Sequence, residues 1–592
     1  MAGTDSIVRV DLADESVTSE PVPDSWLREY VGGKGLGARY LYEELEPGVD
    51  PLGGSNVLCV LTGPLTGYLP GEQRYVVVTK SPLTGTFLDS YAGGSMAGRL
   101  AGSLGGHVGV VVSGRADRPV VLEVEAGEVS ILPAEDLWGL DARETDERLA
   151  DAAVACIGTA GENRVSYATI ATDGGDHHAG RGGAGAVMGS KRLKAVVARD
   201  GPLEPDGELE ALRERYETRF AEDDTGRWHA ASETVETLDF ANETGVLPTR
   251  GWQEGSFDGA EGVGIEAIRD AAHDRERADD PVPGGFRVES DDGESVPRGS
   301  TPIVLGAGLG IDDFDAVATL GSVCDRLALD VISSGNAVAW AIRASEEGVV
   351  QRDLSFGDGD AARELVEEIA TRSTPLGDAL ADGVEAATAT YGGEELIPSV
   401  KGMELPSYDP RGAASMALAY ATSDRGACHR RARPVELEAI DGTEWTTAGR
   451  VETVVAEQDR RAVLWSLIAD DFFGEALTAD LGAEWLAAVD RTYEPADLRR
   501  VGARIWTLVR LFNVREGFSR SDDRLPERLT EPLEGGPNDG GRIDPDAFDA
   551  MLDRYYERRG WDENGVPTAE TIRGLGLESL TPDGVEEILD GR

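Results

Sequence analysis

A glycine-rich stretch around one arginine, residues 177–194, most constrains how this chain can fold. Glycine allows main-chain N–H groups to approach an anion closely, and the guanidinium of Arg181 offers a planar pair of donors. The stretch therefore predicts either a loop that binds a phosphate or another anion, or a loop that only packs a helix tightly on a sheet. Its other glycines and cations are Gly180, Gly182, Gly183, Gly185, Gly189, Lys191, Arg192 and Lys194.

Residues 180–185 also match the Gly-x-Gly-x-x-Gly pattern of dinucleotide-binding loops, with Asp200 at the expected distance. That pattern requires a strand that ends directly before the loop. Here the preceding residues are Asp-Gly-Gly-Asp-His-His, and the region before them is rich in strands rather than βαβ units. The context therefore favours an anion-binding loop over a dinucleotide fingerprint.

The charge of the chain limits its partners and its surroundings. The net charge is −54 over 592 residues. Such a field disfavours binding to nucleic acid and to anionic membranes. The acidic residues are spread along the chain rather than collected in one block, so disorder does not explain them. We expect a surface adapted to concentrated salt, in a halophilic cytoplasm.

The length of the chain predicts about two to four domains. The N-terminus lacks the layout of a signal peptide, and no apolar stretch approaches the length of a membrane helix. The cysteines lie far apart and form no Cys-x-x-Cys pair, so we expect neither a disulfide framework nor a local zinc or iron–sulfur site. They are Cys59, Cys156, Cys324 and Cys428.

Hydrophobic patterning divides the chain into a strand-rich first third and a helical remainder. The predicted strands are residues 6–12, 56–61, 74–80, 108–113, 120–124 and 193–198. The predicted helices are residues 36–44, 145–154, 208–220, 311–330, 336–347, 361–372, 413–420, 460–468, 475–489, 497–513 and 545–558. We expect residues 252–300 to form long loops, because they are rich in Gly, Asp and Pro.

Two further segments could contribute to an anion site. Gly63-Pro-Leu-Thr-Gly and Lys80-Ser-Pro-Leu-Thr-Gly repeat one pattern around a predicted strand, and the pair Gly93-Gly94 follows. Each segment alone predicts only a turn. Together with Arg74 and Arg181, the turns suit a large polyanionic cofactor better than a single phosphate.

The segment Asp424-Arg-Gly-Ala-Cys-His-Arg-Arg431 is a second candidate site. His429 is one of six histidines in the chain, and the cations beside it are expected to lower its pKa. It is either a catalytic group or an ordinary structural histidine. Asp325 and Asp330 flank the end of a predicted helix, where their simplest role is capping.

Taken together, these segments resemble the aldehyde ferredoxin oxidoreductase family, and the acidic composition resembles a haloarchaeal member. The similarity keeps the family's order up to about residue 520 and is most specific in the first third. The matching motifs are Gly63-Pro-Leu-Thr-Gly, Lys80-Ser-Pro-Leu-Thr-Gly, Leu137-Trp-Gly, Gly158-Thr-Ala-Gly-Glu-Asn, the stretch around Arg181, Ile311-Asp-Asp, Cys324-Asp-Arg-Leu-Ala-Leu-Asp330 and Asp424-Arg-Gly-Ala-Cys-His429.

The resemblance implies an α+β fold. A β-rich N-terminal domain, residues 1–203, would hold two sheets in a pseudo-twofold arrangement and cradle the cofactor. A middle helical domain, residues 204–402, and a C-terminal helical domain with an acidic tail, residues 403–592, would close over the other side. The family often forms dimers, so a homodimer is possible.

The resemblance also implies a tungsten, or molybdenum, bis-pterin cofactor. The residues that would hold its pterins and phosphates are Arg74, Gly93, Gly94, Arg181, Gly182, Gly183, Asp325, Asp330 and Arg431. His429 would lie near the metal and is the candidate catalytic residue. The implied reaction converts an aldehyde and water into a carboxylate and releases two electrons, with the redox chemistry supplied by the cofactor.

The sequence departs from the family where the iron–sulfur cluster would bind. The family's cluster cysteines correspond to residues 278–287, which contain no cysteine, and to Asp470. Trp465 stands at a pterin-binding Asp, and Pro302-Ile-Val replaces an acidic segment near the active site. Carboxylates do not replace thiolates as cluster ligands. We therefore expect no [4Fe–4S] cluster and no protein metal ligands.

The sequence supports two functions. A third, an unrelated nucleotide-binding enzyme, would apply only if the family similarity were accidental. The first is a cytoplasmic aldehyde oxidoreductase that passes electrons to a ferredoxin-like acceptor or a partner subunit. The second is a non-catalytic pterin-binding or structural homologue that pairs with an active, cluster-containing partner. Neither involves nucleic acid or a membrane.

Overall fold

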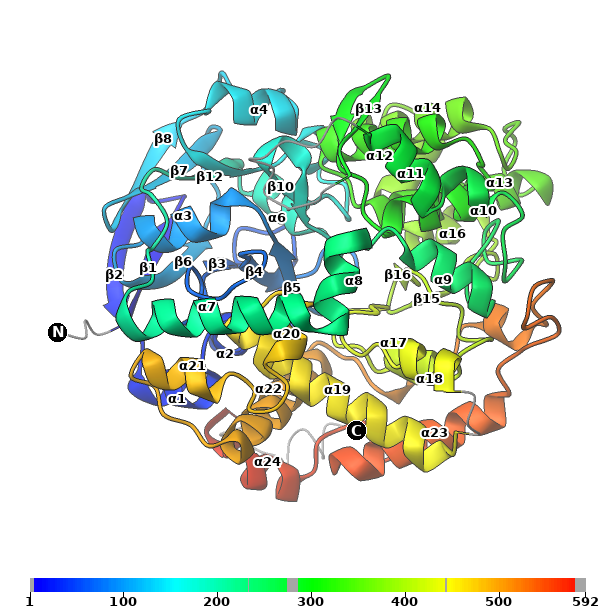
Figure 1. The fold of residues 1–592 in the computed structure, drawn as a ribbon. Coiled ribbons are helices and arrows are strands. Elements are labelled where there is room, and N and C mark those ends of the chain that lie inside the picture. The colour runs from blue at the N-terminus through cyan, green and yellow to red at the C-terminus, as the bar shows by residue number, and fades with distance from the viewer. Residues whose placement is uncertain (1–4, 233, 274–285, 442–444, 581–592) are drawn as a thin grey trace.

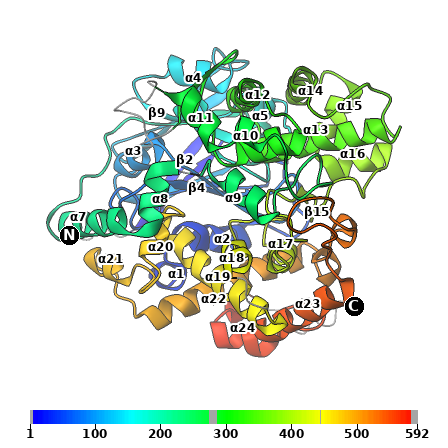
Figure 2. The ribbon, with the colours of Figure 1, turned by 45° about the vertical axis from the view of Figure 1, so that its right-hand side comes forward.

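The computed structural model of the chain describes residues 5–232, 234–273, 286–441 and 445–580. Figure 1 shows β-sheets in the N-terminal third and helices in most of the remainder. In Figures 1 and 2 the C-terminal helices, coloured yellow to red, lie below both the sheets and the middle helices. The predicted α+β fold class, with a two-sheet domain followed by mainly helical regions, is confirmed.

Two six-stranded sheets of the same topology form the N-terminal third. The first has the strand order β2-β1-β6-β3-β4-β5, with β1 (Ser6–Asp11), β2 (Ser16–Pro21), β3 (Leu58–Leu61), β4 (Tyr75–Lys80), β5 (Phe87–Ala92) and β6 (His107–Ser113). The second has the order β8-β7-β12-β9-β10-β11, with β7 (Val120–Glu125), β8 (Glu128–Pro133), β9 (Ala153–Cys156), β10 (Ile170–Thr172), β11 (His177–Ala179) and β12 (Leu193–Ala198). In each sheet the last strand enters between the first and third and runs parallel to the first.

The two sheets pack face to face. Strand residues alternate between two faces. Val8 and Val60 of the first sheet therefore share one core with Leu122 and Val196 of the second. Two helices complete this core: α3 (Ser95–Ser103), which precedes β6, and α6 (Ala184–Ser190), which precedes β12. The two halves of this region therefore share the placement of one helix as well as the order of their strands.

The outer face of the first sheet is covered by helices from both ends of the chain. The helix α2 (Gly33–Glu44) lies on this face, together with the long C-terminal helices α19 (Thr447–Leu467) and α22 (Pro495–Arg515). Val76 and Val78 on the sheet share a core with Leu467 and Ile505. The segment that follows α19 is therefore fixed beside the N-terminal sheet.

Helices of the middle region pack together beside the second sheet, in green in Figure 1. The backbone of Ala168 pairs with that of Leu329 in an isolated bridge, which joins the two regions. The other elements before residue 402 are α1 (Asp24–Tyr30), α4 (Ala142–Arg148), α5 (Thr159–Glu162), α7 (Gly207–Glu222), α8 (Asp224–Ser232), α9 (Thr237–Thr244), α10 (Ala260–Val263), α11 (Ile265–Ala272), β13 (Val288–Ser290), β14 (Gly293–Ser295), α12 (Phe314–Leu327), α13 (Val331–Glu346), α14 (Gly359–Thr371), α15 (Pro375–Ala381), α16 (Val384–Tyr391) and β15 (Ser399–Val400).

The C-terminal region shares its main core with the middle region. Val246 and Trp340 belong to the same buried cluster as Tyr420, Val454 and Trp561. The remaining elements are β16 (Met403–Glu404), α17 (Ser415–Ala421), α18 (Val435–Asp441), α20 (Phe473–Ala476), α21 (Ala483–Ala488), α23 (Pro545–Arg559) and α24 (Ala569–Leu575). Because this core crosses residue 402, the domain limits 1–203, 204–402 and 403–592 stay predictions.

The prediction of a helix over residues 145–154 is wrong. The helix α4 begins after Asp141, whose carboxylate accepts the N–H of Glu144 in a capping box. The chain then enters β9, a buried strand that pairs with β12 and β10. Pairing on both sides of this short run outweighs the local preference for helix.

Other element boundaries also differ from the predictions. Residues 252–300 include two short helices, α10 and α11, and the hairpin β13–β14, while residues 274–285 lie outside the described part. The predicted helix 460–468 is the end of α19, and residues 475–489 are divided between α20 and α21. Among the helices that the structure describes, none has the length and apolar character needed to span a bilayer.

Candidate functional site

A cavity of about 1010 Å³ lies where the three regions of the chain meet. The N-terminal sheet domain contributes Arg74 and Arg181, the middle helices contribute Asp325 and Asp330, and the C-terminal region contributes side chains between Ser407 and Glu475. This volume is at the upper end of the range of small-molecule sites. The cavity is therefore large enough for a ligand well beyond a single phosphate.

Most of the predicted site residues line this one cavity. They are Arg74, Gly93, Arg181, Asp325, Asp330, His429 and Arg431, together with Asp470. Gly94, Gly182 and Gly183 instead stand just behind the wall, at the starts of α3 and α6. The fold thus brings the predicted residues together, while their individual roles in binding stay predictions.

The two glycine pairs occupy equivalent positions in the two sheets. Gly94 precedes α3 with φ +83°, and Gly183 precedes α6 with φ +87°, a conformation that side chains disfavour. A Cβ at Gly94 would lie 1.8 Å from a carboxylate oxygen of Asp173, and one at Gly183 would lie 2.1 Å from the carbonyl of Ser166. Close packing therefore requires glycine at both positions, as the packing alternative for this stretch also predicts.

Arg181 ties the three regions together. Its guanidinium donates to the Ser333 hydroxyl at 3.0 Å and to the carbonyls of Glu404 and Ala427. Its backbone N–H donates to a carboxylate oxygen of Asp330 at 2.8 Å. Only Nε of this guanidinium has no partner among the described residues. Arg181 thus acts as a structural fork and leaves one donor for a ligand.

Asp330 is a helix cap as well as a cavity residue. It precedes α13, and its carboxylate accepts the N–H of Ser333 at 2.8 Å. The sequence predicted that this helix starts after Ser334. In the structure it begins at residue 331. Asp325 near the end of α12 lies 3.3 Å from Nε2 of His178 and accepts the Ser295 hydroxyl. The capping role that was expected of such acids is confirmed for Asp330.

Arg74 faces the cavity between two acids. Its guanidinium lies 2.6 Å from Glu72 and 2.9 Å from Asp470, the residue for which the resemblance predicts a cysteine. Glu72 also pairs with Nδ1 of His177 at 2.9 Å. Burial opposes ionisation of Glu72, but Arg74 and His177 outweigh it and hold the Glu72 pKa well below its usual range. Asp470 thus serves as a partner for an arginine in this protein.

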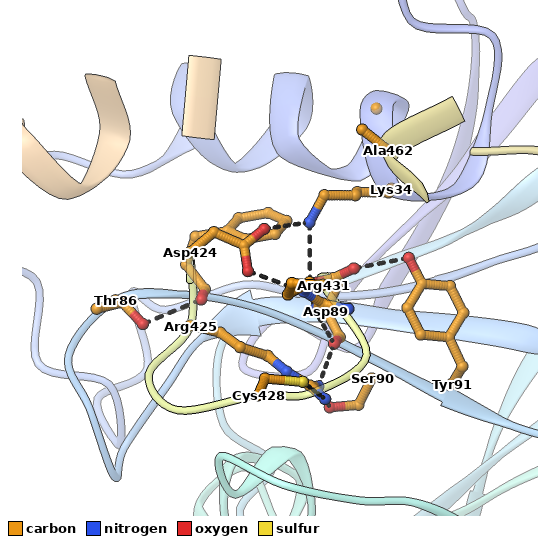
Figure 3. Close-up of polar contacts among 12 residues, drawn as sticks. Lys34, Thr86, Asp89, Ser90, Tyr91, Asp424, Arg425, Cys428, Arg431 and Ala462 are labelled. Carbon is orange, nitrogen blue, oxygen red and sulfur yellow. Dashed lines mark hydrogen bonds and ion pairs between the residues drawn. The ribbon is translucent and has the colours of Figure 1, made fainter. Parts of the chain in front are cut away.

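Four buried charges form what we call the inner charge cluster: Lys34, Asp89, Asp424 and Arg431. Figure 3 shows Lys34 and Arg431 both reaching the two carboxylates. None of these side chains is more than 3% exposed. Burial works against ionisation of Asp424, but Arg431 and Lys34 lower its pKa. The cluster joins α2, β5 and the loop that carries His429.

Sequence reasoning missed Lys34 and Asp89. The only available signal was the scarcity of lysine together with its position in a Gly-Gly-Lys-Gly turn. Arg431, which the resemblance assigned to the cofactor, donates instead to Asp89 and Asp424, and Nη1 is its only atom without a partner among the described residues. Its main contacts are therefore structural.

Cys428 and His429 lie on the cavity wall beside this cluster. Burial lowers the pKa of His429 well below its usual value, and the charges of Arg430 and Arg433 lower it further. The direction predicted from the sequence is confirmed. Nδ1 of His429 has no hydrogen-bond partner in the described chain. A neutral imidazole with a free ring nitrogen can accept or relay a proton.

Arginines and acids of the C-terminal region also line the cavity, in what we call the outer ion-pair network. It includes Arg430 with Asp471, Arg461 with Glu457 and Asp471, and Arg460 with Glu457 and Glu475. Burial disfavours the charge of Asp471, but Arg430 and Arg461 lower its pKa. Side chains of this network are up to 35% exposed. The arginines of this network are therefore paired with carboxylates of the protein itself.

Trp465, which stands where the resemblance predicts an Asp, also lines the cavity. Its ring lies 4.0 Å from that of Tyr91, and the guanidinium of Arg430 lies 5.2 Å from the indole. Ile303, in the segment where the resemblance predicts an acid, lines the cavity from a buried π-helical turn, Pro302–Gly306. The side chains of Trp465 and Ile303 are thus aromatic and apolar where the resemblance predicts carboxylates.

Unpartnered nitrogen donors gather around the cavity. Each of the following atoms is buried, belongs to a lining residue and has no hydrogen-bond partner within the described residues: Arg74 Nε, Arg181 Nε, Arg425 Nε, Arg431 Nη1 and Trp465 Nε1. A buried donor without a partner is costly, so such groups call for a ligand. The arrangement fits a large ligand rich in acceptor atoms and negative charge.

The described residues offer no comparable site for a metal ion. They contain no group of three or more His, Cys, Asp or Glu side chains placed to hold one. All four cysteines are free and buried, which confirms the expected lack of disulfides. They lie in β3, β9, α12 and the loop before α18.

Known proteins match the chain along nearly its whole length. A family model described as "Aldehyde ferredoxin oxidoreductase, N-terminal domain" matches residues 7–200, and one described as "Aldehyde ferredoxin oxidoreductase, domains 2 & 3" matches residues 211–577. A tungsten-containing aldehyde ferredoxin oxidoreductase of Pyrococcus abyssi is 33% identical over 606 residues, which covers 97% of this chain and 99% of the relative.

Two more distant proteins are also similar. A Pyrococcus furiosus protein named aliphatic sulfonate oxidoreductase, WOR-like subunit, is 28% identical over 632 residues, with 96% of each chain covered. The solved active site complex BamBC of benzoyl coenzyme A reductase superposes with a TM-score of 0.81 at 23% identity, covering 100% of this chain and 99% of the other. The solved structure supports the fold alone.

Proposed function

The chain belongs to the aldehyde ferredoxin oxidoreductase family, and from this premise we propose that it oxidises an aldehyde to a carboxylate at a tungsten, or molybdenum, bis-pterin centre. The electrons would pass to an external acceptor. The observation that supports this best is the set of unpartnered donors around one cavity of about 1010 Å³. Fused pterins with phosphates are ligands of that size and acceptor content.

The residues of this cavity fit such a cofactor. Arg74 Nε and Arg181 Nε would donate to its phosphates, and Gly93 lines the same cavity. Asp325 and Asp330 would accept hydrogen bonds from the N–H groups of one pterin. When bound, the cofactor would supply the two-electron chemistry.

His429 would handle a proton in this reaction. Its pKa lies well below the usual value, so the ring is neutral near pH 7. Its unpartnered Nδ1 can accept a proton from water or from the substrate. The apolar wall at Ile303 would exclude other solvent from that position.

An iron–sulfur cluster does not fit this protein. Asp470 pairs with Arg74 at the position of one family cysteine, and the chain has no cysteine in residues 278–287. Cluster ligation requires thiolates. We therefore propose that electrons leave through a ferredoxin-like acceptor or a partner subunit, and the protein itself could form a homodimer.

The acidic composition supports a setting in concentrated salt. With a net charge of −54, self-repulsion is strong unless salt screens it. We propose a cytoplasmic protein of a halophile. Unfolding measured across a range of KCl concentrations tests this, and a protein that is most stable in dilute buffer would contradict it.

The decisive experiment measures the tungsten, molybdenum, iron and pterin content of the protein purified from its own host in high salt. We expect two pterins with one tungsten or molybdenum and no iron. Protein without metal and pterin would contradict the proposed oxidation. Four irons per chain would contradict the proposed loss of the cluster.

A non-catalytic subunit is the alternative, and Ile303 and Trp465 favour it. Both occupy cavity positions where the family carries acids. Such a homologue would bind pterin or pair with an active, cluster-containing partner without oxidising aldehyde itself. Purified protein that holds both pterin and metal but reduces no viologen dye with any of a panel of aldehydes would support this alternative.

A further inference from the structure

The four cysteines of this chain divide into three inert thiols and one different thiol. All four are buried and free. Burial raises the pKa of Cys156 to about 12 and raises the pKa of Cys59 and Cys324 as well. For Cys428 burial acts in the same direction, but the charges of Arg425 and Arg431 outweigh it and lower the pKa. Only this cysteine also lines the cavity.

Cys428 is held by a guanidinium that is itself fixed. Nη2 of Arg425 donates to the Cys428 sulfur at 3.2 Å. Nη1 of the same guanidinium donates to the carbonyl of Asp89 at 2.6 Å and lies 3.4 Å from the Ser90 hydroxyl. Figure 3 shows the sulfur beside the end of Arg425, below the inner charge cluster. The Cys428 sulfur is therefore held in place by a fixed donor.

Two donors without partners lie on the same wall. Arg425 is 4% exposed and Arg431 is 1% exposed, and both line the cavity. Nε of Arg425 and Nη1 of Arg431 find no hydrogen-bond partner in the described part of the chain. A nucleophile next to fixed N–H donors is the arrangement that stabilises an oxyanion formed by attack on a carbonyl group.

We propose that Cys428 is a nucleophile that adds to the carbonyl carbon of an aldehyde in the cavity and forms a reversible hemithioacetal. A sulfur lone pair forms the new C–S bond, and the π electrons of the carbonyl move to its oxygen. The free donors of Arg425 and Arg431 stabilise that oxygen until water supplies its proton. No electron leaves in this step, so it needs no oxidant. The choice of an aldehyde rests on the proposed function.

The adduct would fix the position of the substrate. Its tetrahedral carbon keeps the aldehyde hydrogen and is held on the cavity wall next to His429. A covalent hold reduces the entropy lost in orienting a small molecule for reaction. Small aldehydes, which offer little apolar surface to bind, gain the most from it.

The test uses the purified full-length protein and acetaldehyde that is isotopically labelled at its carbonyl carbon. Nuclear magnetic resonance should detect a protein-bound carbon in the hemithioacetal region, upfield of free aldehyde and distinct from its hydrate. The signal should vanish in Cys428→Ser and persist in Cys156→Ser. Cys156→Ser is a matched control because Cys156 is equally buried, bonds only the carbonyl of Ala142, and lies outside the cavity lining.

A second measurement uses the wild type alone, in case Cys428→Ser does not fold. Iodoacetamide should alkylate Cys428 roughly 10-fold or more faster than Cys156, because the thiolate is the reactive form. Mass spectrometry of peptides identifies the site, and acetaldehyde should slow the alkylation of Cys428 alone. Equal alkylation of both cysteines, or no effect of acetaldehyde, would overturn the proposal.

The outcomes separate this proposal from the proposed function. Aldehyde oxidation without a hemithioacetal signal, or at an unchanged kcat/KM in Cys428→Ser, overturns the role of Cys428 and leaves the oxidoreductase intact. A hemithioacetal signal in protein that holds no metal and oxidises no aldehyde supports Cys428 as a nucleophile and contradicts the proposed aldehyde oxidation.

Discussion

The inner charge cluster and the outer ion-pair network use the same chemistry at different depths. In the inner cluster the carboxylates of Asp89 and Asp424 are at most 3% exposed. In the outer network Arg430 is 29% and Glu475 is 35% exposed. Because water and salt screen the more exposed pairs of the outer network, such as Arg460–Glu475, these pairs add little to stability. An inner charge that loses its partner is left in a medium that solvates it poorly.

The comparison indicates which arginines have donor atoms available for a ligand. Solvent can replace the partners of the more exposed outer arginines, such as Arg430, so the number of such arginines says little about binding. Inner arginines such as Arg425 and Arg431 are fixed by protein groups, and each keeps one donor atom without a partner in the described chain. Those remaining donors point to the ligand more strongly than the total count of arginines.

The largest expected effect breaks the inner cluster. In Asp424→Asn, Lys34 and Arg431 lose a shared countercharge, and we expect a loss of about 3–5 kcal/mol in the free energy of unfolding. Denaturant titration in high salt measures it. The control Asp378→Asn breaks an exposed pair with Arg372 and should cost less than about 1 kcal/mol. Equal losses in the two variants would show that depth does not matter here.

A smaller loss is expected where an arginine ties the regions together. Arg181→Lys removes the fork that reaches Ser333, Glu404 and Ala427, and one ammonium cannot replace it. We expect a loss of about 2–3 kcal/mol in unfolding free energy and a lower pterin content. Arg192→Lys, in the same stretch but bonded to carbonyls near the surface, should change neither. Unchanged stability in Arg181→Lys would contradict the structural fork.

His429 borders both regions and provides a pH test. Its pKa in the folded protein is depressed, so the unfolded chain takes up a proton first as pH falls through about 6.5. Stability is therefore present above that pH and is lost below it, by at most about 1.4 kcal/mol per pH unit. His429→Gln should reduce this slope between pH 7 and pH 5. An identical slope in the variant would mean that other groups control it.

Asp470 provides a test of the proposed loss of the iron–sulfur cluster. Asp470→Cys removes the partner of Arg74 and the acceptor for the N–H groups of Phe472 and Phe473. We expect about 1–2 kcal/mol lower stability and no bound iron, because the other three thiolates are missing. Asp470→Asn is the control for stability. Stoichiometric iron in Asp470→Cys would contradict the expectation.

The smallest effect is expected in the outer network. Arg460→Gln breaks pairs with Glu457 and Glu475 near the surface. We expect a loss below about 1 kcal/mol in dilute buffer, and less in concentrated KCl. Thermal unfolding at two salt concentrations measures both values. A loss above about 2 kcal/mol at high salt would place this network with the inner cluster.

Local patterns predicted the fold class but missed several elements. Strands with a clear alternation or apolar run, such as residues 120–124 and 193–198, were located to within a residue. The strand β9 was taken for the end of a helix, because its four residues have no periodicity of their own. Its identity comes from partners in β10 and β12. Long-range pairing of this kind leaves no trace in a short window.

The candidate site shows the same division. The sequence located Arg74, Arg181, Asp330 and His429, and the structure brings them to one cavity. The sequence did not reveal that the Arg181 guanidinium donates to two protein carbonyls, those of Glu404 and Ala427. A guanidinium bonds carbonyls and phosphates equally well, so residue type alone does not distinguish the two.

The sequence by itself determined the family, the glycines at the starts of two helices and the lack of cluster cysteines. Each of these depends on residue identity at one place. Tertiary structure decided which charges are paired and which thiol has a lowered pKa. Lys34 meets Asp424 across 390 positions of sequence, and Cys428 has a lowered pKa only because folding buries it beside Arg425 and Arg431. Electrostatic energies depend on distance and burial, and only the folded chain sets both.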